Sequence, residues 1–168
     1  MGDTARRLAA THTLTHGRNV SLLERIRETS LRLDPIVHPE IEGFWAGLRE
    51  RELRVQVCSR CGTYRFPFAP VCFNCRSFDA TWEVISPSGT VASAVTVHRA
   101  TGEQVWASHV PFVSALVDLE HGLRLPGRIL CSCGEAASRG ARVRAVVLAA
   151  EGAVDVHGFA HSCIAPVS

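Results

Sequence analysis

The chain has 168 residues, of which 46% are apolar and 20% charged, a composition typical of globular domains and not of disordered chains. It carries no run of eighteen apolar residues and no secretory signal pattern, so we expect no membrane-spanning helix and a cytoplasmic location. All 18 basic residues are arginine, which excludes lysine-based chemistry such as Schiff-base catalysis.

The N-terminal part, residues 1–37, is predicted to be a tail followed by one helix. The first 19 residues show no hydrophobic period and are expected to form the tail. The sequence from Ser21 to Glu24 has the capping-box pattern, in which the first and fourth side chains bond to the free N–H groups of a helix start. We therefore expect a helix from residue 22 to about residue 33, ended by the Asp34–Pro35 step.

A second helix is predicted from Pro39 to about Arg51, followed by a strand over residues 53–58. Proline suits the first helical turn because the N–H that it lacks has no partner there. The helix would carry one apolar stripe at the spacing i, i+3, i+4, i+7, made of Ile41, Phe44, Trp45 and Leu48.

Two Cys-x-x-Cys pairs lie ten residues apart after this strand. Each pair can offer two thiolates from a tight turn to one tetrahedral ion. Structural zinc is the expected ligand, with a rubredoxin-like iron centre as the alternative, since the same ligand set binds both. Disulfides are disfavoured in a reducing cytosol. The predicted ligands are Cys58, Cys61, Cys72 and Cys75.

The other three cysteines are Cys131, Cys133 and Cys163. We interpret them as small buried apolar residues, with a second metal site as the less favoured alternative.

Downstream of the cysteines the hydrophobic period changes to two, which is typical of strands. Segments of this kind are bounded by glycine or proline and leave no room for βαβ units. Five or six strands are predicted, and this number in this length favours a small closed barrel of the OB type over residues 80–163, with Gly127 at a bend. The predicted strands cover residues 81–86, 90–99, 111–120, 123–133, 141–150 and 153–160.

In this order, the motifs resemble the zinc-ribbon plus OB-fold family formerly catalogued as domain of unknown function 35. The resemblance spans about residues 38–162 and includes Cys-x-x-Cys-Gly, "FPFAPVC", "SGTVASAVTVH" and "PFVSALVDLEHG". Family members commonly have "PPR" before the second pair, where this chain lacks the basic residue. The resemblance implies N-terminal helices, a rubredoxin-like ribbon over residues 38–79 and an OB barrel. It also implies a hetero-oligomer with thiolase-like enzymes, hydroxymethylglutaryl-CoA synthase, aldolases, hydratases or acyltransferases of secondary metabolism.

No catalytic set is evident in the sequence. The acid–base candidates His98, His109 and His157 are scattered over predicted strands with no nucleophile-like turn nearby. Asp118 and Glu120 share one strand face, which is more typical of a solvated surface than of a catalytic pair. We therefore expect a chain that is not catalytic by itself.

Two binding functions fit the sequence. Single-stranded nucleic acid is the alternative, because OB barrels and zinc ribbons bind it with aromatic side chains and basic grooves. We favour an accessory subunit of an acyl-CoA or acyl-transfer complex. Residues 49–76 carry six arginines and two glutamates, a net +4 that suits coenzyme A phosphates or an acidic partner. The predicted partner or coenzyme A contacts are Phe44, Trp45, Arg60, Arg65 and Phe66. For the two aromatics of the helix, packing on the chain's own barrel is the alternative.

Overall fold

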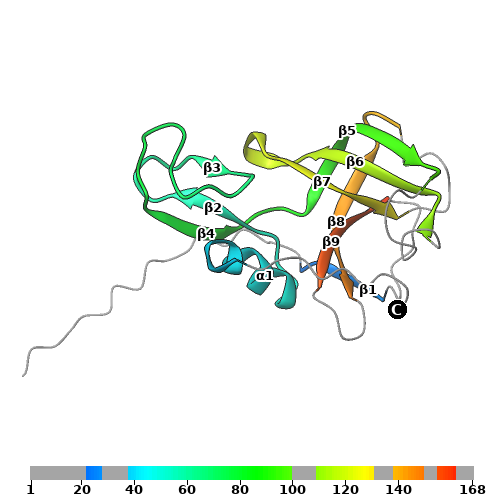
Figure 1. The fold of residues 1–168 in the computed structure, drawn as a ribbon, viewed down its shortest axis with the longest axis horizontal. Coiled ribbons are helices and arrows are strands. Elements are labelled where there is room, and N and C mark those ends of the chain that lie inside the picture. The colour runs from blue at the N-terminus through cyan, green and yellow to red at the C-terminus, as the bar shows by residue number, and fades with distance from the viewer. Residues whose placement is uncertain (1–21, 28–37, 100–108, 131–137, 150–154, 162–168) are drawn as a thin grey trace, which may run out of the picture.

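The computed structural model describes residues 22–27, 38–99, 109–130, 138–149 and 155–161. It consists of a small three-stranded sheet with a short helix beside it and a larger closed sheet (Figure 1). None of the described helices is long and apolar enough to cross a membrane.

The smaller part is the zinc ribbon and its helix. The predicted helix is confirmed in two pieces, a 3-10 turn η1 (Pro39–Ile41) and an α-helix α1 (Glu42–Arg49). The three strands pair antiparallel in the order β3-β2-β4, so the central strand leads directly into the first cysteine pair. Their bounds are Arg54–Cys58 for β2, Tyr64–Arg65 for β3 and Ala80–Val84 for β4.

The larger part is a closed five-stranded barrel, as predicted. Its strands follow the order β8-β5-β6-β7-β9, and pairing between β9 and β8 closes the ring. The pairs are antiparallel except for β7 with β9, which run parallel. Their bounds are Ser88–Val97 for β5, Phe112–Asp118 for β6, Arg124–Leu130 for β7, Arg142–Ala149 for β8 and Val156–His161 for β9; a 3-10 turn η3 (Glu120–Gly122) joins β6 to β7.

The predicted helix from residue 22 is wrong for the part that the structure describes. Strand β1 (Glu24–Arg27) pairs in parallel with β8, with Glu24 opposite Val146. Ile26 packs against a small apolar cluster on β8 and β9, and Arg25 forms two 2.9 Å hydrogen bonds with the Asp155 carboxylate. Pairing to the free edge of a distant strand therefore overrides the local capping pattern. Residues 28–37 lie outside the described residues.

One hydrophobic core joins the ribbon to the barrel. Buried side chains of α1 and β2 belong to the same cluster as those of the barrel strands. Gly127 on β7 permits part of this packing, because a Cβ there would lie 2.6 Å from the ring of Phe159. Gly127 thus makes room for the aromatic ring of Phe159. Because the ribbon and the barrel share one core, we expect the stability of each part to depend on the other.

Candidate metal centre and its surroundings

Each cysteine pair lies on a tight turn with the same hydrogen-bond pattern. In the first turn the N–H of Gly62 donates to Cys58 O at 2.9 Å, and in the second the N–H of Arg76 donates to Cys72 O at 2.9 Å. Both donors have positive φ, +70° for Gly62 and 60° for Arg76. Glycine adopts this conformation without steric cost, whereas arginine does so under some strain.

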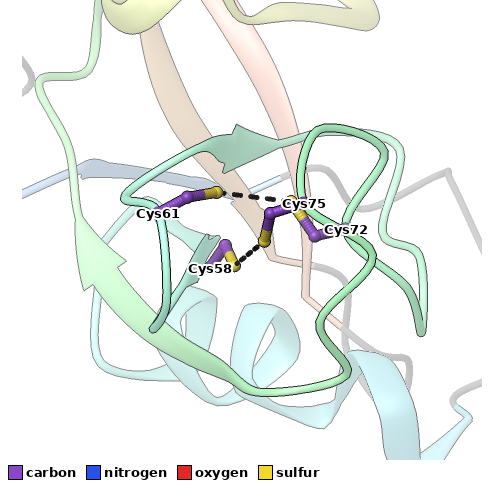
Figure 2. Close-up of side chains that lie close together, drawn as sticks. All are labelled: Cys58, Cys61, Cys72 and Cys75. Atoms are coloured by element: carbon purple, nitrogen blue, oxygen red, sulfur yellow. Dashed lines mark hydrogen bonds between the residues drawn. The ribbon is translucent and has the colours of Figure 1, made fainter.

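The two turns bring the four sulfur atoms together. Their Sγ atoms all lie within 4.8 Å of one another, with 3.5 Å between Cys58 and Cys75 and 3.7 Å between Cys61 and Cys72 (Figure 2). Zinc–sulfur bonds of about 2.3 Å in a tetrahedron place sulfurs roughly 3.8 Å apart. The spacing therefore fits one tetrahedral ion and is too long for disulfide bonds.

The electrostatics of the four thiols favour a cation between them. Hydrogen bonds from the side chain and backbone of Thr63 lower the pKa of Cys61 to about 6. At Cys75 the backbone hydrogen bond from Ser77 also lowers the pKa, but the neighbouring Cys61 sulfur, burial and the other two sulfurs outweigh it and raise the pKa to about 12. The cluster therefore resists full ionisation without a positive ion, and a bound metal would deprotonate its thiols.

Four cysteine ligands would fill a tetrahedral ion without an open position for water or substrate. Cys58 and Cys72 are buried under the ribbon, whereas Cys61 is exposed at its surface. A closed Cys₄ site is typical of structural metal, since catalytic zinc keeps a coordination position free. The residues present therefore fit zinc in a folding role. Cys131, Cys133 and Cys163 lie outside the described residues.

The aromatic stripe of α1 packs inside the chain. Phe44 and Trp45 are only 3% and 9% exposed, and the Phe44 ring lies 5.4 Å from the ring of His157 on the barrel. Phe44 also contacts Phe68, which in turn contacts the half-buried Phe66. The structure thus supports the packing alternative for this stripe, because little of either helix side chain is left for a partner to contact.

The arginines of residues 49–76 do not form one basic surface. Arg49 pairs with Glu42, Arg54 with Glu50 and Glu52, and the Arg51 Nε–H donates to Leu23 O at 2.8 Å. Arg65, predicted to contact a partner, is 1% exposed, and none of its guanidinium nitrogens has a hydrogen-bond partner among the residues that the structure describes. Its β3 position, opposite Gln56 in the sheet, buries the side chain and leaves little of it for a partner to contact.

Two arginines of this segment remain available, Arg60 and Arg76, which are exposed in the first and second cysteine turns. The predicted contacts do not include the exposed aromatics beside them, Phe73 and Phe78, each 76% exposed. For Phe73 the signal is its place between Cys72 and Cys75, because a residue between two ligands of one tight turn can point away from the metal.

Three of the acidic and histidine candidates, Asp118, Glu120 and His157, form contacts with structural roles. Asp118 pairs with Arg124 at 2.6 Å, and this hydrogen bond holds the pKa of the carboxyl below its usual range. Glu120 accepts a 2.6 Å hydrogen bond from the N–H of Ser86. His157 donates to Pro126 O at 2.7 Å, and burial lowers its pKa. These groups stabilise the barrel and are not assembled around a common reacting position.

An open cleft of about 870 Å³ lies at one end of the barrel, between the start of β5 and β8 and the end of β6. Its walls mix carboxylates and guanidinium groups: Glu24, Asp118 and Glu120 with Arg142 and Arg144. A groove that follows a nucleic-acid backbone needs a predominantly positive lining. The cleft therefore does not favour the nucleic-acid alternative.

Known protein families match both parts of the chain. Residues 45–80 match the family described as "ChsH2, rubredoxin-like zinc ribbon domain" and residues 82–148 that described as "ChsH2, C-terminal OB-fold domain". A chain of the solved structure titled "Ltp2-ChsH2(DUF35) aldolase" superposes with a TM-score of 0.68 at 26% identity, over 76% of this chain and 98% of that chain.

Two curated relatives extend the comparison. The chain is 34% identical over 98 residues to a probable enoyl-CoA hydratase alpha subunit of Thermomonospora curvata, which is 57% of this chain but only 29% of that subunit. It is 33% identical over 104 residues to a DUF35 domain-containing scaffold protein of Methanocaldococcus jannaschii, covering 61% of this chain and 72% of that protein. With its ribbon and barrel both matched, the chain belongs to the DUF35 family of zinc-ribbon and OB-fold proteins.

Proposed function

We propose that this chain is a non-catalytic scaffold subunit of a complex that acts on acyl-CoA, with a hydratase or an aldolase as its enzymatic partner. The proposal rests on one structural similarity. This chain superposes on a chain of the structure titled "Ltp2-ChsH2(DUF35) aldolase", and the superposition covers 98% of that chain. A relative named as a hydratase alpha subunit and another named as a scaffold protein support the same class of role. The family resemblance also implies thiolase-like enzymes and acyltransferases, and these are the alternative enzymatic partners.

The arrangement of the described residues supports a scaffold role over a catalytic one. The cysteine site is closed by four protein ligands, so it offers no position for a substrate. Asp118 accepts hydrogen bonds from Arg124, and Glu120 accepts one from the N–H of Ser86. His157 donates to the Pro126 carbonyl. Catalysis needs a nucleophile or base within reach of a reacting atom, and none of these groups is free for that task.

Zinc is the metal that we propose for the four cysteines. The metal would supply ribbon stability, because its thiolate ligands would join two turns that are separated in sequence. Elemental analysis of the purified chain should find about one zinc per chain. Iron with rubredoxin-like absorption, or well-folded protein without metal, would contradict this assignment.

The scaffold proposal is tested by purification of the tagged chain from its native host and identification of its companion. We expect a hetero-oligomer that contains a hydratase- or aldolase-type subunit in a fixed ratio. The chain alone should show no turnover of acyl-CoA substrates, and its addition to the separately expressed companion should raise the companion's activity or solubility. Turnover by the chain alone, or its recovery without any companion, would overturn the proposal.

Nucleic-acid binding predicts a different result. With only Arg60 and Arg76 available in the ribbon, single strands would be bound with a log–log salt slope of only about −1.4. Filter binding at low salt should therefore give weak retention. Tight, steeply salt-dependent retention of single-stranded DNA or RNA would favour the alternative and contradict the scaffold role.

A further inference from the structure

The tip of the second cysteine turn exposes an unusual amount of apolar surface. Phe73 lies between Cys72 and Cys75, Phe78 follows the turn, and each is 76% exposed; Val71 beside them is also exposed. Exposed phenylalanines gathered on one feature are uncommon in soluble proteins and are typical of binding sites. We name the surface formed by Arg60, Val71, Phe73, Arg76 and Phe78 the ribbon tip.

The backbone of both cysteine turns brings these residues to one end of the ribbon. The N–H of Cys72 donates to Ser77 O at 2.9 Å, which closes the second turn and places Phe73 and Phe78 at its two ends. The N–H of Ser59 donates to Asp79 O at 3.2 Å, so Phe78 lies next to the first turn and its Arg60. Because metal ligands fix both turns, the aromatics would be presented on a rigid backbone, and little conformational entropy would be lost on binding.

Within the described part of the chain, the charges at the ribbon tip are unpaired, unlike those of the neighbouring arginines. Arg49, Arg51 and Arg54 are held by carboxylates or a carbonyl, whereas Arg60 and Arg76 have no partner among the described residues. The carboxylate of Asp79 also lies at the tip, where it accepts a 3.3 Å hydrogen bond from the Ser77 hydroxyl. The ribbon tip therefore combines exposed apolar side chains with two guanidinium groups, and the Asp79 carboxylate lies beside them.

We propose that the ribbon tip is the surface through which this chain docks into an apolar pocket, edged with carboxylates, on its enzymatic partner. The inference rests on the proposed scaffold function and assigns the interface within it. Aromatic side chains at the centre and arginines at the rim are the composition of protein–protein hot spots. A carboxylate-edged pocket complements the two unpaired guanidinium groups and steers the encounter.

Two other occupants fit the ribbon tip less well. A second copy docking through the same surface would bring four unpaired arginines together, and like charges in contact oppose association. A nucleic acid could stack on the two phenylalanines, but two cations provide too little phosphate neutralisation for stable binding. The observations therefore favour an acidic protein pocket.

The test uses the full-length zinc-loaded chain and the companion subunit recovered with it, with the dissociation constant measured by calorimetry or biolayer interferometry. Phe73→Ala and Phe78→Ala should each weaken binding by about 30-fold or more, the size expected of a hot spot. Because both side chains are exposed, zinc content and melting temperature should stay unchanged. Val95→Ala is the matched control: Val95 is 61% exposed on β5, away from the ribbon, and its loss should change affinity less than twofold.

The charged rim gives a second readout. The double variant Arg60→Glu and Arg76→Glu should slow association at low salt by about tenfold and abolish the salt dependence of the association rate.

Each outcome separates the docking surface from the scaffold function. Alanine variants that bind within twofold of the parent chain, with the complex still formed, would overturn the ribbon tip alone. If Val95→Ala lost binding and the two phenylalanine variants did not, the interface would lie on the barrel and not on the ribbon tip. The parent chain could instead self-associate with rising concentration or bind a single-stranded oligonucleotide, and Phe73→Ala could abolish that binding. Either result would show that a second copy or a nucleic acid, and not a protein pocket, binds the ribbon tip. Failure of the parent chain to retain any companion would overturn both proposals.

Discussion

Glycine 43 on α1 offers a direct test of how the helix lies on the ribbon. A Cβ at this position would lie 2.3 Å from Cε2 and 2.4 Å from Nε1 of the Trp82 indole on β4. Non-bonded carbon atoms settle at about 3.5–4 Å, so Gly43→Ala requires a shift of more than about 1 Å. The indole is held by Phe68, whose ring lies 5.3 Å away, and the helix is held through the Phe44–His157 contact.

Two opposing effects decide the sign of the change. Alanine in place of glycine within a helix contributes about 1 kcal/mol of favourable propensity. Overpacking of a rigid ring costs about 1–3 kcal/mol, and the shortness of the contact places Gly43→Ala at the upper end. We therefore expect a net loss of about 1–2 kcal/mol in the free energy of unfolding, and a melting temperature lower by roughly 3–8 °C.

Chemical and thermal unfolding followed by circular dichroism would measure this loss, and a double-mutant cycle would assign its cause. In a Trp82→Leu background the clash is relieved, so Gly43→Ala should become neutral or stabilising, with a coupling energy of at least about 1.5 kcal/mol. A higher melting temperature for Gly43→Ala in the parent chain, or additive effects of the two substitutions, would refute the close contact between α1 and the ribbon.

Two further predictions concern the metal and pH. Zinc removal by a chelator, or Cys72→Ser, should unfold the ribbon and also lower the melting temperature of the barrel, because one core joins them. An unaltered barrel transition would contradict the shared core. Burial holds the folded-state pKa of His157 below its ordinary value, so the unfolded chain binds more protons, and stability should fall as the pH drops below about 6.5, by up to about 1.4 kcal/mol per pH unit. His157→Gln, which can still donate to Pro126 O, should flatten that dependence, and an unchanged profile would show that another group titrates.

The four-cysteine cluster could be predicted from sequence because its information is local. Cysteine spacing within each turn, and Gly62 at the position that requires positive φ, define the ligand geometry over a few residues. The barrel could be predicted from the alternation of apolar residues and the turn residues between strands, since both reflect backbone geometry within a single strand. The closure of the barrel followed from strand number and length and from the absence of intervening helices.

Tertiary structure decided the features that depend on partners far along the chain. Residues 21–24 carry a helix-start pattern, yet Glu24–Arg27 form a strand because β8, more than a hundred residues later, offers an unpaired edge. An apolar stripe on a helix indicates that it is buried but not against what, and the structure packs Phe44 against the chain's own barrel.

The charges of the ribbon follow the same rule. From the sequence alone, the six arginines of residues 49–76 are predicted to form one positive region. Folding pairs three of them, buries Arg65, and leaves only Arg60 and Arg76 exposed without a partner among the described residues. Charge is a property of composition, whereas its availability depends on which carboxylates and carbonyls the fold brings within about 3 Å. That distance is determined only when the chain has folded.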